Sequence, residues 1–420
     1  MSLARSFAAA GLLGLALAAC DASAQEPARL PARGAATTRV TLGIEVLLAD
    51  GAPGLAGKRL GLVTNPSGVD SKLVATADLL ARDKRWTLVQ LFSPEHGVRG
   101  DAPAGASVAS AVDSATGLPV ESLYGDAKQP SAAALERVDA ILFDIQDIGS
   151  RTYTYISTLG EVMAAAAKAH KPVWVLDRPN PLGGVLFEGP MREERWKSFI
   201  GYGPMPVSHG MTIGEVARFF QKELAIDVDL HVVAMRGWRR SMVWEDTGLE
   251  WVPTSPHIPH ALSAHVYIAT GMIGGIAKNV NEGVGWTLPF ETIAAEFIDA
   301  RAFREAMESA RLPGVSFRET HYTPRYGKFA DKPLHGVQLH LVDLHEFRPL
   351  RTALTALCTL QRLYGAKMEL ESERALGIHW GTLSVFEAIR AGSTPATIEA
   401  TWKSELESFA KKRAAVLLYE

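Results

Sequence analysis

The fold class is decided by one stretch of sequence, A-I-L-F-D-I-Q-D-I-G-S-R-T-Y-T-Y-I-S-T-L-G-E-V-M-A-A-A-A-K-A-H at residues 140–170, together with P-V-W-V-L at 172–176. Its first four residues, Ala140–Phe143, are apolar and suit a short buried strand. The alanine-rich segment Tyr153–His170 then predicts a long helix, and Pro172–Leu176 predicts a second strand. Strands that are apolar on both faces and joined by a helix indicate a parallel sheet.

The same alternation extends outward in both directions. Strands are predicted at Lys58–Thr64, Thr87–Phe92 and Val228–Met235, a short edge strand at Leu118–Tyr124, and helices at Ser71–Arg82, Ser131–Val138 and Thr212–Leu224. The last helix begins with Thr212 and Glu215 at the spacing of a capping box. The first part of the chain is therefore predicted to be an α/β domain, a Rossmann-like parallel sheet covered by helices.

The pattern becomes less regular after Gly237, where tryptophans and prolines interrupt it. Gly336–Leu344 predicts a strand, and Leu350–Leu363 and Pro395–Lys412 predict helices. We therefore predict an export signal at 1–24, a linker at 25–39, the Rossmann-like domain at 40–250 and a smaller α+β C-terminal domain at 251–420.

The first residues have the features of an export signal. An apolar run from Phe7 to Ala19 follows a cation and is too short to span a membrane. Two cleavage sites compete: Leu17–Cys20 resembles a bacterial lipobox, with Cys20 lipidated, whereas Ala22–Ala24 suits ordinary cleavage. The protein is therefore expected to be periplasmic, with a membrane anchor if Cys20 carries lipid. The other cysteine, Cys358, is expected to be a small buried hydrophobe.

The overall composition excludes some partners and cofactors. The 420 residues carry a formal net charge of −3 without a basic block, which argues against nucleic acid as a partner. No G-x-G-x-x-G follows the first strand, so no dinucleotide cofactor is expected. No G-x-S-x-G is present, which disfavours a serine nucleophile of the hydrolase type.

Polar residues follow four predicted strands directly. Ligands of open parallel sheets bind beyond the carboxyl ends of the strands. The motifs at these ends are N-P-S-G at 65–68, S-P-E-H-G-V-R-G at 93–100, D-I-Q-D-I-G-S-R at 144–151 and D-R-P-N-P-L-G-G at 177–184. They are expected to form one crevice with Glu95, Asp144, Asp147 and Asp177 on its rim.

Glu95 is the strongest catalytic candidate in this crevice. An aspartate at a strand end often only caps the next helix, but glutamate is a poor turn residue and no helix follows Glu95 at once. Two carboxyls facing one cleft suit glycoside hydrolysis, where one donates a proton and the other stays ionised. Asp144 and Asp147 are equal candidates for the second carboxyl, and Asp177 can equally pair with an arginine.

The remaining polar groups predict the character of the ligand. Arg99, Arg151 and Arg178 suggest an anionic group on the ligand, although each could instead neutralise a carboxylate. A platform for a sugar ring is expected from Tyr153, Tyr155, Trp174 and His209. A metal held by His96, His209, Asp144 and Glu95 is the rival arrangement, but no H-E-x-x-H or paired-cysteine spacing supports it and no metal is predicted.

As a set, these motifs resemble the exo-β-N-acetylmuramidase family, long catalogued as a domain of unknown function. The resemblance rests on the four strand-end motifs, on the T-Y-T-Y-I that continues the third of them, and on H-G-M-T-I-G-E at 209–215. It implies a Rossmann-like catalytic domain and removal of terminal N-acetylmuramic acid from the non-reducing ends of peptidoglycan fragments. It also implies that Glu95 is catalytic, and the lactate carboxylate of muramic acid would give the arginines a partner.

The second half departs from the family pattern. His257 stands where the family has asparagine, Val284 where it has arginine and Trp286 where it has threonine. These changes leave the expected fold intact and permit a related amino sugar as substrate, or a muropeptide-binding envelope lipoprotein that does not cleave. The predicted substrate-binding residues are Asn65, His96, Arg99, Arg151, Tyr155, Asp177, Arg178, Asn180, His209 and Glu282.

Overall fold

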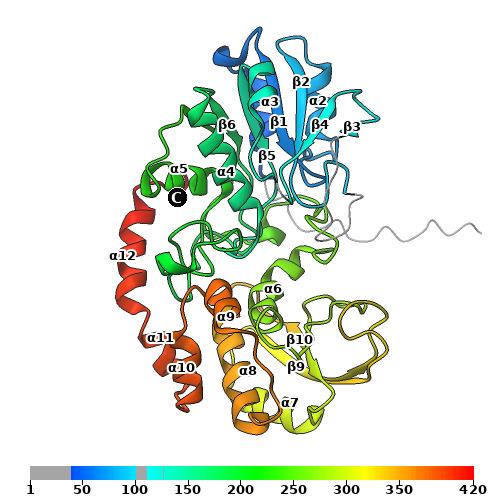
Figure 1. Cartoon of the computed structure of the whole chain (residues 1–420), viewed down its shortest axis with the longest axis vertical. Helices are drawn as coiled ribbons and strands as arrows, with labels where there is room; N and C mark the ends of the chain where they lie inside the picture. The colour runs from blue at the N-terminus through cyan, green and yellow to red at the C-terminus, as the bar shows by residue number, and fades with distance from the viewer. Residues whose placement is uncertain (1–38, 101–110, 126) are drawn as a thin grey trace, which may run out of the picture. The chain divides into compact units, whose positions relative to one another are not determined.

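The computed structural model describes residues 39–100, 111–125 and 127–420. Its first part is built around a seven-stranded sheet with the order β3-β4-β2-β1-β5-β6-β7 (Figure 1). The strands are β1 (Arg59–Thr64), β2 (Thr87–Ser93), β3 (Ala111–Val112), β4 (Pro119–Ser122), β5 (Ala140–Asp144), β6 (Val173–Leu176) and β7 (Leu230–Val233). All pairs are parallel except β3 with β4, so the predicted Rossmann-like sheet is confirmed.

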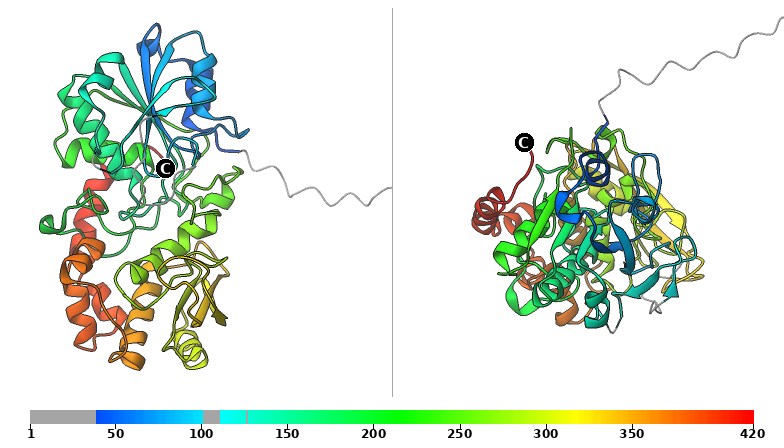
Figure 2. Two further views of the ribbon diagram at one scale, coloured as in Figure 1. Left: turned by 45° about the vertical axis from the view of Figure 1, so that its right-hand side comes forward. Right: turned by 90° about the horizontal axis from the view of Figure 1, so that it is seen from above.

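Helices cover both faces of this sheet, as Figure 2 shows. They are α1 (Gly43–Asp50), α2 (Thr76–Arg82), α3 (Ala132–Arg137), α4 (Tyr155–Lys168) and α5 (Ile213–Glu223). Alternate residues of β5 belong to two separate cores, with Ile141 and Phe143 in one and Ala140 and Leu142 in the other. The continuous apolar run at 140–143 is therefore explained by burial on both faces.

The second part is α+β, as predicted. A three-stranded antiparallel sheet with the order β8-β10-β9 is formed by β8 (Thr292–Ala295), β9 (Val315–Tyr322) and β10 (Leu334–Leu341). The helices are α6 (Ala261–Gly274), α7 (Ala300–Ser309), α8 (Pro349–Tyr364), α9 (Glu373–Trp380), α10 (Ser384–Arg390), α11 (Pro395–Ala400) and α12 (Lys403–Ala414). The predicted domain boundaries near residues 40 and 250 remain predictions.

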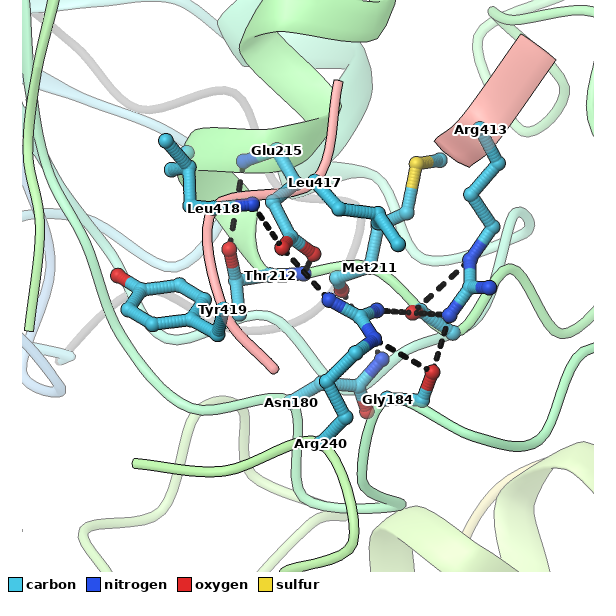
Figure 3. A network of polar contacts seen from close by, with 12 residues as sticks. Asn180, Gly184, Met211, Thr212, Glu215, Arg240, Arg413, Leu417, Leu418 and Tyr419 are labelled. Atoms are coloured by element: carbon cyan, nitrogen blue, oxygen red, sulfur yellow. Dashed lines mark hydrogen bonds and ion pairs between the residues drawn. The ribbon is translucent and has the colours of Figure 1, made fainter. Parts of the chain in front are cut away.

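After α12 the chain returns to the Rossmann-like part, where its end lies beside α5 (Figure 1). The Leu418 amide donates to Glu215 Oε1 over 2.9 Å, and the Tyr419 hydroxyl donates to Asp177 Oδ2 over 2.5 Å. Arg413 of α12 donates to the carbonyls of Gly184 and Gly210. The C-terminal tail, residues 415–420, thus completes the polar packing at the carboxyl ends of β6 and β7 (Figure 3).

Several predicted elements differ from the structure. Leu118–Tyr124 contains β4, which is not an edge strand because the short β3 pairs on its outer side. The predicted helix at Pro395–Lys412 is two helices, α11 and α12, separated at Thr401–Trp402. The helix predicted from Ser71 begins only at Thr76. The capping box of Thr212 and Glu215 is confirmed.

Six elements of the second part were not predicted, namely α6, β8, α7, β9, α9 and α10. α6 is buried on nearly all sides, so its sequence carries little amphipathic periodicity. Cys358 is half-buried in α8, and burial raises the pKa of its thiol to about 11. In the portion of the chain described, none of the helices combines the length and apolar character that crossing a membrane requires.

Candidate active site

The candidate site is built at the carboxyl ends of three neighbouring strands, β2, β1 and β5. Glu95 follows β2, Asn65 follows β1, and Asp147 lies three residues after the end of β5. Because β1 is hydrogen-bonded to both β2 and β5, these three loops emerge side by side. The sheet order also changes direction at β1, which is the switch point where ligands bind in open parallel sheets.

Glu95 lies in a turn that is held from several directions. Its Oε2 accepts a hydrogen bond from Thr154 Oγ1 over 3.2 Å, at the start of α4. The Tyr124 hydroxyl is also bonded to Glu95, and burial, followed by this bond, raises the pKa of Tyr124 to about 12. The carboxyl itself is only partly buried. Glu95 is therefore positioned by hydroxyl groups while it remains accessible.

The backbone of this turn adopts an unusual conformation. His96 is buried and has a φ of 74°, and Gly97 has a φ of 80°. A positive φ is uncommon outside glycine and costs roughly 1–3 kcal/mol at positions of this kind. Residues in such conformations cluster at active sites. His96 shares this conformation with six other non-glycine residues among those described, and it is the one that lies next to Glu95.

Asp147 is held on one side and has an unpaired oxygen on the other. Oδ2 accepts a hydrogen bond from the Gly149 amide over 2.7 Å and lies 3.2 Å from His209 Nε2. His209 is fully buried, and its Nδ1 accepts from the Met211 amide, so Nε2 carries the proton of the neutral ring. The two side chains are close without the alignment of a hydrogen bond, and Nε2 has no other partner among the described residues. Oδ1 of Asp147 is buried and likewise has no hydrogen-bond partner in the described part of the chain.

Asp144, the alternative to Asp147, has a different environment. Its two oxygens accept from Arg178 Nε over 2.5 Å and Arg178 Nη2 over 2.8 Å, and Thr76 Oγ1 adds a third bond of 2.5 Å. The side chains of both ionic partners are at most 3% exposed. Arg178 also donates to the Val69 carbonyl. The Asp144–Arg178 pair connects the loop that follows β1 to the end of β5, and the two charges neutralise each other.

A set of buried hydroxyls connects the site to the segment before α6. The Thr254 carbonyl accepts from Tyr155 Oη over 2.5 Å and from Asn65 Nδ2 over 3.3 Å. The Tyr153 hydroxyl lies 2.7 Å from Thr254 Oγ1. Asn65 and Tyr155, both predicted to bind substrate, therefore anchor the loop at 253–260 beside the site.

Tyr267 of α6 brings a further side chain to the two carboxyls. Burial raises its pKa to about 12, and the negative charges of Glu95, Asp147 and Glu282 contribute in the same direction. Tyr267 is thus close enough to all three carboxyls for their charges to act on it, and its hydroxyl lies 3.3 Å from Thr152 Oγ1. Burial also raises the pKa of Glu282 to about 6, and its carboxyl lies against Gly274 of α6, where any larger side chain would collide with it. Glu282 thus packs against α6 within the C-terminal part, and its role in substrate binding remains a prediction.

Two other predicted residues, Asp177 and Asn180, lie in the network that holds the C-terminal tail, and Figure 3 shows Asn180 in it. Asp177 is fully buried and accepts from Thr212 Oγ1, the Gly214 amide and the Tyr419 hydroxyl. Asn180 donates to the Met211 carbonyl and accepts from the Leu182 amide. Burial raises the pKa of Asp177 to about 7. The structure does not bring either side chain to Glu95, because both are consumed by packing of loops and tail.

The arginines predicted to hold an anion are bound to the protein itself. Arg99 pairs with Asp113 and Asp78, so it neutralises carboxylates. Arg151 is completely buried and donates to the carbonyls of Pro190, Met205 and His379, which joins the two parts of the chain. Arg178 is bound to Asp144 as described. Neutralisation of carboxylates, the alternative that the sequence left open, describes Arg99 and Arg178, whereas Arg151 binds backbone carbonyls.

The predicted sugar platform is only partly assembled. Trp174 lies within β6 and stacks on His231 at 4.1 Å between ring centroids, so it is not at the strand end and the prediction was wrong. Tyr153 and Tyr155 lie edge to face at 4.8 Å near the site. Both are buried, and their hydroxyls are bonded to Thr254.

The departures at Val284 and Trp286 are accommodated by local packing. The Val284 carbonyl accepts from Asn281 Nδ2 over 3.0 Å. Trp286 stacks on Tyr322 at 5.8 Å and packs on the small apolar cluster that contains Phe329 and Leu334.

Three residues close to Glu95 were missed by the sequence reasoning. Tyr124 was predicted as the last residue of a strand, but β4 ends at Ser122, so the strand-end rule would have found Tyr124 had the strand been predicted to end there. Thr154 belongs to the quoted T-Y-T-Y segment but carried no signal of its own. Tyr267 lies in an unpredicted helix, and only the tertiary structure places it beside Asp147. Across the described ranges, no group of three or more His, Cys, Asp or Glu side chains could hold a metal ion. Cys20, the predicted lipidation site, lies outside the described residues.

Comparison with known proteins gives a consistent result over nearly the whole chain. A family model described as the N-terminal part of exo-β-N-acetylmuramidase NamZ matches residues 60–262, and the model of its C-terminal part matches 265–419. The chain is 44% identical over 381 residues to the peptidoglycan β-N-acetylmuramidase NamZ of Bacillus subtilis strain 168, covering 91% of this chain and 92% of that protein.

Two crystal structures of DUF1343 family proteins from Bacteroides fragilis are similar in fold. One has a TM-score of 0.85 and 38% identity, the other a TM-score of 0.72 and 27% identity. Each comparison covers 91% of this chain and 99% of the other. The sequence match, the two family models and the shared fold together place this chain in the exo-β-N-acetylmuramidase NamZ family.

Proposed function

We propose that this protein is an exo-acting glycoside hydrolase that releases N-acetylmuramic acid, or a close relative, from the non-reducing ends of peptidoglycan fragments. The proposal rests on two carboxyls that follow neighbouring strands at the switch point of the sheet. Glu95 is accessible, and Asp147 has a buried Oδ1 without a hydrogen-bond partner among the described residues. The enzyme identity of the Bacillus subtilis relative supports catalysis. It disfavours the alternative of a lipoprotein that binds muropeptides without cleaving them.

In this proposal Glu95 is the general acid that protonates the departing glycosidic oxygen. A general acid contributes a factor of about 10² to 10⁴ to the rate. The hydroxyls of Thr154 and Tyr124 fix the direction of its carboxyl. Partial exposure leaves room for the sugar beyond it.

Asp147 is the second carboxyl in this proposal, and Asp144 is not. A carboxylate that orients water or stabilises positive charge at the sugar carbon needs an oxygen that is not already bonded. Asp147 Oδ1 meets this requirement, whereas Asp144 is fully engaged by Arg178 and Thr76. His209 and the Gly149 amide hold the other oxygen of Asp147 in place.

The decisive experiment compares wild type and Glu95→Gln on a chromogenic N-acetylmuramide and on the matching N-acetylglucosaminide. We expect cleavage of the muramide only, reduced at least about 10²-fold in the variant. Glu136→Gln, an exposed position on α3, is the matched control and should keep full activity. Full activity of Glu95→Gln, or cleavage of neither substrate by folded wild type, would contradict the proposal.

We further propose that the protein is exported and that Cys20 is lipidated, which would anchor it to the membrane facing the periplasm. The support is the apolar run at 7–19 and the lipobox-like Leu17–Cys20, and Asp21 favours the inner membrane by resemblance to enterobacterial sorting rules. Metabolic labelling with radioactive palmitate should mark wild type and not Cys20→Ala. Equal labelling of wild type and variant, or no labelling of wild type, would contradict the proposed lipidation of Cys20.

A further inference from the structure

Two rings meet on the accessible surface near the Glu95 turn. His257 and Tyr326 lie 6.2 Å apart between ring centroids with an angle of 18° between their planes. His257 Nε2 is 3.2 Å from the Tyr326 hydroxyl. Tyr326 is 53% exposed and is one of few large apolar side chains so open to solvent in the described part of the chain. An exposed aromatic ring held by a partner is a suitable contact for a ligand.

The loop that carries His257 is fixed to the candidate active site. Thr254, three residues earlier, is bound by Asn65, Tyr153 and Tyr155. These partners come from the end of β1 and the start of α4, the elements that flank the Glu95 turn. His257 also lies close enough to His96 for its pKa to be lowered, first by burial and then by the charge of His96.

The loop that carries Tyr326 is fixed to the segment of Glu282. The Arg325 amide donates to the Gly285 carbonyl over 2.8 Å. Gly285 has a φ of 93°, and a Cβ there would come within 2.3 Å of the Tyr326 carbonyl oxygen. Only glycine allows this close approach of the two loops. Tyr326 is therefore presented from a fixed backbone, although its ring is open to solvent.

We propose that His257 and Tyr326 form the binding platform for the leaving-group sugar, the N-acetylglucosamine residue that follows the terminal muramic acid in peptidoglycan. This inference rests on the proposed function. A general acid must contact the glycosidic oxygen, so the departing sugar lies directly beyond Glu95. An exo-acting enzyme encloses the terminal sugar and leaves the rest of the chain in an open region. The His257–Tyr326 platform is open, and its His257 lies on a loop that Asn65, Tyr153 and Tyr155 bind beside the candidate site, whereas Tyr153 and Tyr155 themselves are buried.

The experiment measures kcat/KM of wild type and Tyr326→Ala on two substrates. One is the disaccharide of N-acetylmuramic acid linked β-1,4 to N-acetylglucosamine, and the other is β-N-acetylmuramyl fluoride, whose leaving group is a single atom. We expect the ratio of disaccharide to fluoride kcat/KM to fall about tenfold in the variant, mainly through a higher KM for the disaccharide. Tyr326→Trp should restore most of the ratio because it restores an aromatic face.

Controls separate this inference from the proposed function. Val342→Ala truncates another exposed apolar side chain and should leave the ratio unchanged. A ratio that is the same in wild type and Tyr326→Ala would overturn the platform while leaving the hydrolase intact. Cleavage of neither substrate by wild type would instead overturn the proposed function, and the platform with it.

Discussion

Two regions at the carboxyl edge of the same sheet use similar residues in opposite ways. At the ends of β5 and β6, Asp144 and Asp177 are buried, and hydrogen-bond donors from distant parts of the chain engage both oxygens of each. At the ends of β2 and β5, Glu95 is accessible and Asp147 keeps one oxygen unpaired within the described residues. The first region holds loops and the C-terminal tail together, and the second can act on a ligand. The two regions therefore differ in whether the carboxylate oxygens have hydrogen-bond donors, and they do not differ in residue type or motif.

The largest effect on stability is expected from Asp144→Asn. Removing one partner of a buried ion pair leaves Arg178 uncompensated and should lower the free energy of unfolding by about 3–5 kcal/mol. Urea unfolding measures this loss. Asp139→Asn, in the exposed pair with Arg59, is the matched control and should cost less than about 1 kcal/mol. If Asp144→Asn were as stable as wild type yet inactive, the two regions would have been assigned the wrong way round.

Asp147→Asn should have the opposite effects, a large loss of activity with little loss of stability. We expect kcat to fall about 10²-fold, because the amide cannot act as a carboxylate toward water or the sugar carbon. The free energy of unfolding should change by less than about 1 kcal/mol, because the amide oxygen can still accept from the Gly149 amide. Activity on the chromogenic muramide and urea unfolding of the same preparation test both points. Loss of stability without loss of kcat would contradict the comparison.

The pH dependence of stability tests the fully bonded region directly. Burial raises the pKa of Asp177 to about 7, above the value of about 4 in an unfolded chain. Between these values the folded state binds more protons than the unfolded state, so stability falls as the pH rises and then levels off above about 7. From pH 5 to pH 8 this carboxyl should lower the free energy of unfolding by about 2–3 kcal/mol.

The control for this measurement is Asp177→Asn, which cannot ionise. Burial also raises the pKa of Glu188 to about 7, so a part of the slope should remain in the variant. The difference between the two slopes belongs to Asp177. If wild type and variant had identical slopes, Asp177 would have the same pKa in the folded and unfolded states, contrary to the prediction.

The smallest effect is expected from Tyr419→Phe. The variant removes two hydrogen bonds of the C-terminal tail, the one that Tyr419 donates to Asp177 and the one that it accepts from the Met235 amide, and should cost about 2 kcal/mol of stability. Activity at saturating substrate should stay within about twofold of wild type, because the tail does not contact Glu95 or Asp147 through any described bond. A large loss of kcat in a stable Tyr419→Phe protein would mean that the tail shapes the site.

Much of the fold could be predicted because its strands and helices have distinct local sequence patterns. The buried strands of the Rossmann-like part are short apolar runs, and the helices between them have recognisable starts, as at Thr212 and Glu215. The second part was harder, because α6 is apolar on most faces and β9 alternates over only eight residues. Such segments depend on neighbours that are distant in sequence.

The candidate site could be predicted in part. The strand-end rule selected Glu95 and Asp147 as candidate site residues. It selected Asp144, Asp177 and Arg178 on the same grounds. Local sequence does not reveal whether a polar side chain will meet a partner contributed by a remote segment. Arg151, whose partners include the carbonyl of His379, is the clearest case.

The sequence by itself determined the parallel α/β class and the family resemblance and singled out Glu95 as the catalytic candidate, because each depends on residues that are close together along the chain. The tertiary structure alone showed that both oxygens of Asp144 are bonded whereas Asp147 Oδ1 has no partner among the described residues, and it gave the three arginines partners within the protein. The physical reason is burial. The free energy of a buried charge depends on whether its hydrogen bonds are satisfied, and those bonds are formed between segments that only folding brings together.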